Sequence, residues 1–253
     1  MVDVKGKTVI ITGGGTGIGY GVATAFAKEG AELTITGRRE QPLLDAKKTL
    51  EDEFGAKVLA ISADGTDEDA VQGVIDKTVA EYGKIDVVIN NAQASKSGIM
   101  LADHSKEDFD LAINTGLYGV FFYMRSAFPY LKENKGTVIN FASGAGLSGK
   151  VGQSSYAAAK EGIRGLTRVA ANEWGEFGIN ANIVCPLAMT ERLMVFKEEY
   201  PDVYEQTIKG VPLQRFADPE MDIGKVCLFL ASDDASFITG ETISVQGGVG
   251  LRP

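Results

Sequence analysis

The sequence predicts an α/β fold: a doubly wound, mainly parallel sheet of seven strands with helices on both faces. Two observations predict it. Short runs rich in Val and Ile, with little polar alternation, recur between stretches of helical periodicity, which is the pattern of parallel strands buried on both faces. Glycine, amide and hydroxyl residues also gather where these runs end, and a doubly wound sheet binds its ligands at the carboxyl ends of its strands.

Strand and helix patterns follow one another without a repeat, a low-complexity tract or a linker, so residues 1–253 form a single predicted domain. Right-handed crossovers then place the helices on both faces of the sheet. Helical periodicity is clear after the first strand, along 107–132, and around Tyr156. The strands are expected at 7–12, 31–36, 57–61, 85–90, 136–142, 179–184 and 241–245.

Composition limits the class of protein. At 253 residues and 26.9 kDa the chain can build one large core, and its 44% hydrophobic content is ordinary for a soluble globular protein. The formal net charge of -9 argues against nucleic acid as a partner, because phosphate backbones reward basic surfaces. Neither a signal-peptide pattern nor a long apolar run is present, so we expect a cytoplasmic protein without a membrane partner.

The chain contains only two cysteines and one histidine. Cys185 and Cys227 lie in apolar runs and are expected to be buried thiols in a reducing compartment. The single histidine, His104, cannot build a zinc site alone, so no metal is expected. It also gives little basis for a Ser-His-Asp triad.

A glycine-rich segment follows the first strand and opens an apolar-periodic helix. A strand, a glycine turn and a helix N-terminus form an anion site, because backbone N–H groups point outward and the helix dipole favours phosphate. The segment lacks the Gly-Lys-Ser/Thr of a P-loop. We therefore predict a dinucleotide site whose first contacts come from Gly13, Thr16, Gly17, Ile18 and Gly19.

The residues at the end of the second strand indicate which dinucleotide is expected to bind. An acid at this position would bind a ribose 2′-hydroxyl, whereas an arginine suits a 2′-phosphate. The sequence has Gly37 followed by Arg38 and Arg39, with no carboxylate before Glu40. We predict NADP(H) as the cofactor; the alternative is two ordinary surface arginines.

Tyr156 and Lys160 stand four residues apart on one predicted helix, after Ser143 at the end of the fifth strand. An i, i+4 pair shares a helix face, so the lysine ammonium should lie beside the phenol. A fixed positive charge favours the phenolate, so we expect the pKa of Tyr156 to be lowered. A tyrosine tuned in this way can exchange a proton near neutral pH, as carbonyl reduction and alcohol oxidation require.

Together, T-G-G-G-T-G-I-G at 12–19, N-N-A-Q at 90–93, Asn114, Ser143, Tyr156 and Lys160 resemble the short-chain dehydrogenase/reductase family over essentially the whole chain. The resemblance implies a Rossmann-like fold, with Tyr156 as acid/base, Ser143 bonded to the substrate oxygen, Lys160 on the nicotinamide ribose and Asn114 anchoring a relay water. Further cofactor contacts implied by the resemblance are Asp64, Gly65, Asn91, Ala92, Pro186, Met189 and Thr190, and further substrate contacts are Ala145 and Gln153.

Three positions depart from the family pattern. Gln93 replaces the glycine of N-N-A-G, Leu187 replaces the glycine after Pro186, and V-Q-G-G at 245–248 replaces V-D-G-G. By resemblance, the first two lie beside the nicotinamide and the substrate. They bear on the shape of the substrate more than on the type of reaction, and we count Gln93 and Leu187 as candidate substrate contacts.

The segment at about 187–218 is helix-like and carries an unusual apolar set that includes Met194. Methionine and aromatic residues pack adaptably, and a long segment beside a cofactor site is often a lid. The alternative is a pair of ordinary surface helices. An apolar lid over a tyrosine base predicts a bulky apolar substrate, such as a steroid, a bile acid or an aliphatic ketone.

The stretch 107–132 and the Tyr156 helix carry more apolar surface than one sheet face needs, which indicates a partner. In look-alike proteins these helices form a dimer seam and the last strand makes a second two-fold contact, so a homotetramer or homodimer is expected.

The predicted function is an NADP(H)-dependent interconversion of a ketone and a secondary alcohol. One alternative is a β-ketoacyl reductase acting on a carrier protein or CoA, although Asn172 stands before Glu173 where such reductases commonly have arginine. The other is a non-catalytic NADP(H) sensor, which the presence of both Tyr156 and Lys160 disfavours.

Overall fold

The computed structural model describes residues 3–250 and has the predicted architecture, a seven-stranded sheet in the order β3-β2-β1-β4-β5-β6-β7. Every neighbouring pair in it is parallel. The predicted strand ends agree to within about two residues, the usual uncertainty of such boundaries. The strands are β1 Thr8–Thr12, β2 Glu32–Gly37, β3 Lys57–Ser62, β4 Val87–Asn90, β5 Thr137–Phe141, β6 Asn180–Pro186 and β7 Thr242–Val245.

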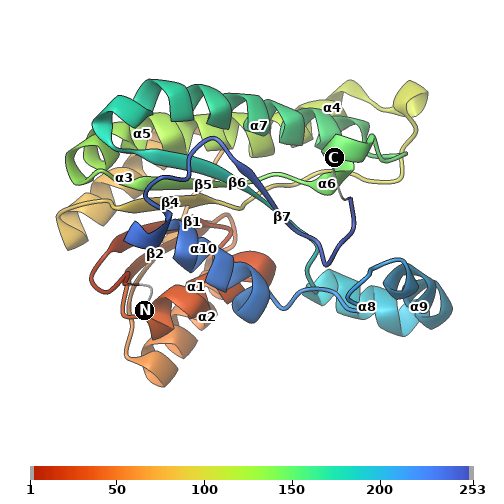
Figure 1. Ribbon diagram of the computed structural model, residues 1–253, viewed down its shortest axis with the longest axis horizontal. Coiled ribbons are helices and arrows are strands. Elements are labelled where there is room, and N and C mark those ends of the chain that lie inside the picture. The colour runs from red at the N-terminus through yellow and green to blue at the C-terminus, as the bar shows by residue number, and fades with distance from the viewer. Residues whose placement is uncertain (1–2, 251–253) are drawn as a thin grey trace.

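Helices cover both faces of the sheet (Figure 1). On one side lie α1 (Gly17–Lys28), α2 (Glu40–Phe54) and α10 (Lys225–Leu230), and on the other α3 (Glu68–Tyr82), α5 (Gly119–Asn134) and α7 (Ser154–Trp174). Alternate side chains of β1 serve the two layers: Val9 and Ile11 pack with Phe26 of α1, whereas Ile10 packs with Met124 of α5. The double burial explains why the strands read as continuous apolar runs.

The stretch 107–132, expected as one regular helix, is interrupted. It consists of α4 (Lys106–Ala112), one wide π-helical segment, η2 (Ile113–Tyr118), and α5. The Thr115 hydroxyl lies 2.6 Å from the Leu111 carbonyl and also exchanges hydrogen bonds with the backbone of Ala94. A single π-turn of this kind often marks a functional site, and here it carries Asn114.

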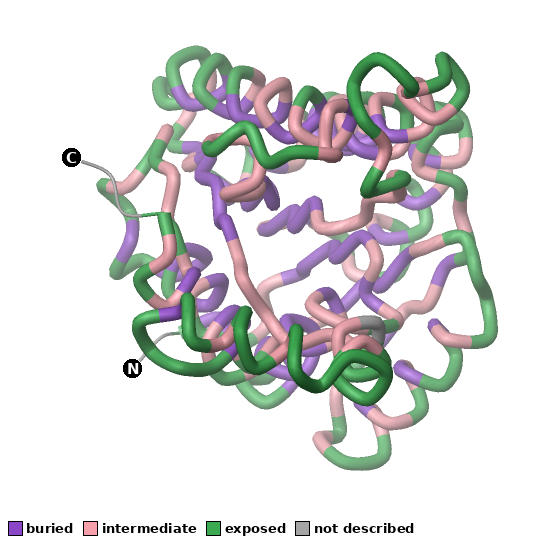
Figure 2. The backbone as a smooth tube through the Cα atoms, turned by 90° about the vertical axis from the view of Figure 1, so that its right-hand side faces the viewer, coloured by how far each residue is buried: buried purple, intermediate pink, exposed green. Residues whose placement is uncertain are grey.

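The segment 187–218 projects from the C-terminal end of the sheet as two short helices, α8 (Glu191–Glu199) and α9 (Pro201–Lys209) (Figure 1). A parallel bridge between Ala188 and Ala217 closes its base. The central strands are buried while these two helices are exposed along most of their length (Figure 2).

The remaining short helices flank the strand ends and the loops between them. They are η1 Leu101–Asp103, α6 Gly144–Ser148, η3 Gly175–Phe177, η4 Pro219–Gly224 and η5 Asp233–Ala235.

Within residues 3–250, none of the helices is long and apolar enough to cross a membrane.

Candidate active site

The glycine-rich turn packs too tightly to hold side chains. A Cβ on Gly13 would lie 2.8 Å from the Asn91 amide nitrogen, and one on Gly19 would lie 2.2 Å from the Gly13 carbonyl oxygen. Gly13 and Gly17 also have positive φ angles, 69° and 56°, which favour glycine. The turn therefore presents bare backbone at the start of α1, where Gly17, Ile18 and Gly19 form the first turn of the helix.

Thr12 connects this turn to the loop after β4. Its hydroxyl accepts hydrogen bonds from the backbone N–H groups of Asn91 and Ala92, each at 3.0 Å, and its carbonyl accepts one from the Asn91 amide. The sequence analysis placed Thr12 in the glycine motif but gave it no role. Its position as the last residue of β1 was the signal that could have shown one.

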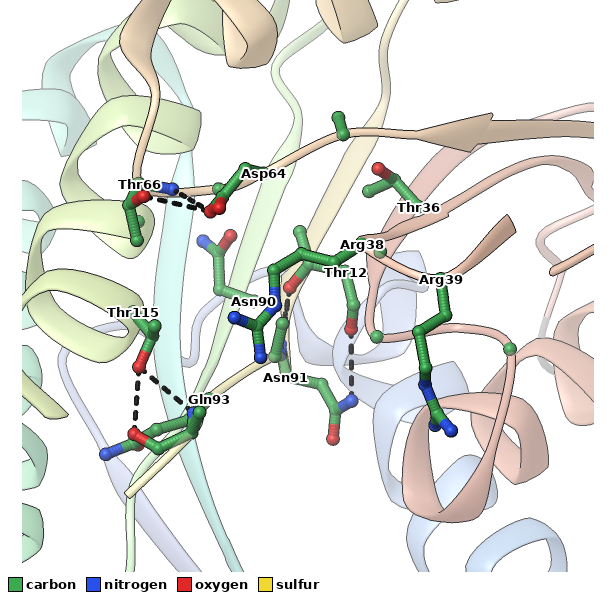
Figure 3. A pocket seen from close by; sticks show the side chains of 18 of the residues that line it. Thr12, Thr36, Arg38, Arg39, Asp64, Thr66, Asn90, Asn91, Gln93 and Thr115 are labelled. Atoms are coloured by element: carbon green, nitrogen blue, oxygen red, sulfur yellow. Dashed lines mark hydrogen bonds between the residues drawn. The ribbon is translucent and has the colours of Figure 1, made fainter. Parts of the chain in front are cut away.

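A cavity of about 510 Å³ extends from the glycine turn across the ends of β2, β3 and β4 to α5. Arg38 and Arg39 both line it, and their side chains leave the end of β2 in different directions, that of Arg38 toward Asn90 (Figure 3). Neither arginine forms a salt bridge with another residue between 3 and 250. Two cations at one rim and bare backbone at the other fit an anionic dinucleotide.

The rest of the cavity wall comes from neighbouring loops. Asp64 accepts hydrogen bonds from the backbone N–H and the hydroxyl of Thr66, at 3.0 and 2.9 Å, which fixes the turn after β3. Gly65 lies against Gly119 at the start of α5. Of the predicted cofactor contacts, the cavity brings together Gly13, Thr16, Arg38, Arg39, Asp64, Gly65, Asn91 and Ala92.

Three further predicted cofactor contacts, Pro186, Met189 and Thr190, lie where β6 leads into α8. Pro186 ends β6, and the Met189 N–H donates to the Ala217 carbonyl at 2.9 Å. Thr190 is the N-cap of α8, and its hydroxyl accepts from the Leu193 N–H at 3.3 Å. Together these bonds fix the base of the segment that carries α8.

Tyr156 and Lys160 lie in the first two turns of α7, with the Lys160 ammonium 5.6 Å from the centre of the Tyr156 ring. Lys160 is buried and donates to the Phe141 carbonyl at 2.7 Å. Ser143 caps α6, accepting from the Ala145 N–H at 3.1 Å. All three residues therefore meet at the carboxyl end of β5.

The expected lowering of the Tyr156 pKa is wrong for this structure. Burial raises the pKa of the phenol, and a hydrogen bond with Ser143 only partly opposes the shift. Burial also lowers the pKa of Lys160 to about 7, and the nearby Cys185 only partly opposes this shift. A lysine that is only partly charged near neutral pH gives the phenolate little support, so the sequence argument underestimated desolvation.

Asn114 is exposed on η2, which packs against α7. The two segments approach closely, since a Cβ on Gly162 of α7 would lie 2.9 Å from the Leu117 side chain. The wide turn thus places Asn114 on the segment next to α7, the helix that carries Tyr156 and Lys160. The Asn114 carbonyl accepts a hydrogen bond from the Gly119 N–H at the end of the turn.

Gln93 lies in the cavity wall, but its amide packs against η2. A Cβ on Gly116 would lie 3.0 Å from the Gln93 side-chain carbonyl carbon. Both polar atoms of the amide are shielded from solvent and have no partner within the described chain. A buried amide without partners is costly, and in this structure the Gln93 amide lies against Gly116 of η2.

The other predicted substrate contacts come from separate elements: Gln153 from the N-terminus of α7, Leu187 from just after the end of β6 and Met194 from α8. Gln153 pairs with Ile99 in an isolated bridge, and its side-chain oxygen accepts from Ser97 at 3.3 Å. Leu187 is held by backbone bonds to Val245 and Ala217. Met194 on α8 is 52% exposed. Gln246 is the residue of V-Q-G-G that departs from the family pattern. Its side-chain oxygen packs against Gly144, the residue after Ser143, and a Cβ built on Gly144 would lie only 2.2 Å from that oxygen.

Several polar contacts behind and beside the site have no signal in the sequence. Arg164 is 2% exposed and donates hydrogen bonds to Glu161 and Thr242. It also donates to the Cys185 sulfur at 3.7 Å. Both cysteines are buried, as expected, and are not joined in a disulfide. Glu191, at the start of α8, accepts from the Gly17 N–H at 3.0 Å. Neither Arg164 nor Glu191 belongs to a pattern that sequence spacing could reveal.

Known proteins resemble the chain over nearly its full length. A family model described as enoyl-(acyl carrier protein) reductase matches residues 13–250. The 12alpha-hydroxysteroid dehydrogenase of a Clostridium sp. is 59% identical over 98% of both chains. The 3-oxoacyl-(acyl-carrier-protein) reductase of Chlamydia muridarum is 37% identical over 96% of this chain and 97% of its own. Among solved structures, levodione reductase superposes with a TM-score of 0.91 at 32% identity, covering 97% of this chain and 98% of its own.

Proposed function

The chain belongs to the short-chain dehydrogenase/reductase family and is an oxidoreductase that uses a nicotinamide cofactor, and on that premise we propose that it interconverts a hydroxyl group and a ketone on a steroid with NADP(H). The observation that carries the substrate class is the 59% identity, over 98% of both chains, with a hydroxysteroid dehydrogenase.

The rim of the site agrees with an apolar substrate. Leu101 and Val151 are 75% and 77% exposed, and the bridge between Ile99 and Gln153 brings their two loops side by side. Met194 of α8 is a further exposed apolar residue, 52% exposed. Exposed apolar residues gathered at one place commonly mark a binding surface.

In the proposed reaction Tyr156 exchanges the proton on the substrate oxygen, and Ser143 holds that oxygen by a hydrogen bond. Because burial raises the pKa of Tyr156, the phenol keeps its proton at neutral pH and is suited to act as the acid in ketone reduction. Lys160, bonded to the Phe141 carbonyl, fixes the floor of the site. The bound nicotinamide supplies or accepts the hydride.

The preference for NADP(H) is part of the proposal. It is supported by Arg38 and Arg39 at the cavity rim. It is also supported by the end of β2 (Glu32–Gly37), which has no acid, because an acid at that position would repel a 2′-phosphate. A carrier-protein or CoA β-ketoacyl reductase is the second candidate, favoured by the 37% identical reductase, and the lower identity places it behind the steroid enzyme.

A homotetrameric or homodimeric assembly and a cytoplasmic location also belong to the proposal. The assembly is supported by an apolar cavity of about 270 Å³ between α5 and α7, lined by Phe121, Phe128, Leu166, Val169 and Trp174 among others. β7 is an edge strand, paired only with β6 in the described sheet, and an unpaired edge offers a second contact.

The test is a substrate panel: 12-oxo steroids, aliphatic ketones and a β-ketoacyl thioester, each offered with NADPH and with NADH, with the product identified by mass spectrometry. We expect the steroid with NADPH to give the highest kcat/KM. The Tyr156→Phe variant should retain cofactor binding and lose about 10²–10⁴-fold in turnover. Preference for the thioester, or a Tyr156→Phe variant that keeps more than half of the rate, would contradict the proposal.

A further inference from the structure

Glu191 joins the base of the lid segment to the glycine-rich turn. It is the first residue of α8, and its Oε1 accepts a hydrogen bond from the Gly17 N–H at 3.0 Å, across 174 residues of sequence. Its second oxygen lies beside the space over Gly17, because a Cβ built on Gly17 would stand 3.3 Å from Oε2. The carboxylate is therefore held at the glycine turn by one hydrogen bond.

Gly17 is the first residue of α1, a helix of 12 residues. The first N–H groups of a helix have no partner within it and form the positive end of its dipole, which is why phosphates bind there. α1 provides no anion of its own: its first turn holds no acidic residue, and the Thr16 side chain makes no capping hydrogen bond. In this structure the anion at the start of α1 comes from α8.

Glu191 thus accepts from a helix N-terminal N–H of the kind that binds phosphate. One N–H donates to one acceptor at full strength, and two anions at the same helix end repel each other. No cation of the described chain forms a salt bridge with Glu191, so Gly17 is the contact that holds the carboxylate.

We propose that Glu191 is a latch that competes with the cofactor diphosphate for the Gly17 N–H and ties α8 to the glycine turn until the dinucleotide binds. The inference rests on the proposed function only in that a nicotinamide dinucleotide binds at this turn. It goes further in assigning a residue that sets cofactor affinity and links the position of α8 to cofactor occupancy. Because Thr190 and Met189 adjoin Glu191, release of the latch acts directly on the segment that borders the substrate.

The test compares the dissociation constants of NADPH and NADH for the wild-type protein, Glu191→Ala and Glu191→Gln. Glu191→Ala removes the competing anion, so both dinucleotides should bind about two- to tenfold more tightly, the range of a single net hydrogen bond. Glu191→Gln keeps an acceptor and loses the charge, so it should fall between the two. Adenosine 2′-monophosphate, which has no diphosphate, should bind all three proteins equally. Glu198→Ala, an exposed change on the same helix, is the matched control and should not alter any of these constants.

A second measurement uses the protein without ligand. Amide hydrogen exchange at Gly17 should be faster in Glu191→Ala than in the wild-type protein, and unchanged in Glu198→Ala. If Glu191→Ala left both dinucleotide constants unchanged, or weakened them, while the wild-type protein bound dinucleotide, the latch alone would be overturned. If the wild-type protein bound neither NADPH nor NADH, the cofactor assignment would fall, and the latch with it.

Discussion

Arg38 and Arg39 are adjacent residues at the end of one strand, yet their side chains take different directions (Figure 3). Arg39 occupies the N-cap position of α2, whereas Arg38 extends along the cavity. A charge-assisted contact to phosphate is worth about 1.5–3 kcal/mol. We therefore expect Arg38→Ala to weaken NADPH binding about ten- to a hundredfold in a fluorescence titration and Arg39→Ala to weaken it less.

NADH provides the internal control for this pair, because it lacks the 2′-phosphate. Its dissociation constant should hardly change in either variant. Equal losses for NADPH and NADH would show that Arg38 contacts a group that both cofactors share, and the proposed cofactor preference would then need another source.

Lys160 gives a pH dependence whose sign follows from its burial. The pKa of Lys160 is lowered from its ordinary value to about 7, so between about pH 7 and 10 the unfolded chain holds a proton there that the folded protein has released. Stability from this group therefore rises with pH across that window, by up to about 1.4 kcal/mol per pH unit. Lys160→Met should remove this rise, as measured by the difference in unfolding free energy between pH 7 and 8.

The comparison between wild type and variant cancels the other titrating groups, such as the buried Cys227 thiol, whose raised pKa acts in the opposite direction. Parallel pH profiles for the two proteins would show that the lysine is not desolvated as the structure indicates.

At the residue scale, the sequence identified the side chains at the strand ends but not their electrostatics. The i, i+4 spacing of Tyr156 and Lys160 correctly placed the two on one helix. The direction of the Tyr156 pKa depends on burial from every side, and spacing along one helix contains no information about burial. For the same reason the contact of Glu191 with Gly17, which joins distant segments, could not be predicted.

At the scale of elements, Gly116 and Gln93 form a matched pair between η2 and the loop after β4. A Cβ on Gly116 would lie 3.0–3.2 Å from three atoms of the Gln93 amide group, so Gly116→Ala should destabilise the protein by about 1–3 kcal/mol through overpacking. In a Gln93→Gly background the crowding is gone, and the same change should instead stabilise by up to about 1 kcal/mol, since alanine is the better helix former.

A double-mutant cycle in urea tests this reversal of sign. Equal effects of Gly116→Ala in both backgrounds would mean that the Gln93 side chain does not lie against η2. Gln93 would then be available to the substrate, as the sequence analysis supposed, and Gln93→Gly should change the ranking of substrates more than the affinity for NADPH.

The elements themselves were predictable where the periodicity was uniform. The buried strands have one simple pattern, because both of their faces are apolar. The π-turn at η2 was not predictable from helical periodicity, and its Thr115 exchanges hydrogen bonds with Ala94, a residue outside the helical stretch. The two helices of the lid segment were expected, and their role as a lid stays a prediction.

On the scale of the whole molecule, the exposed face of α5 and α7 is the surface where a second copy is proposed to pack. Val169 on this face is 50% exposed and lines one cavity with Phe128 and Trp174, whose tilted rings have centroids 4.9 Å apart. Burying a glutamate there would leave a charge without a partner, which is strongly unfavourable. Val169→Glu should therefore lower the assembled mass measured by light scattering during gel filtration. Val203→Glu, a change at an equally exposed residue on α9, should leave that mass unchanged.

The size of the remaining assembly distinguishes a tetramer from a dimer. If β7 provides the second two-fold contact of a tetramer, the Val169→Glu protein should remain a dimer, because that contact is untouched. A protein with the α5–α7 contact alone should fall to monomers. An unchanged mass would place the subunit contact elsewhere on the surface.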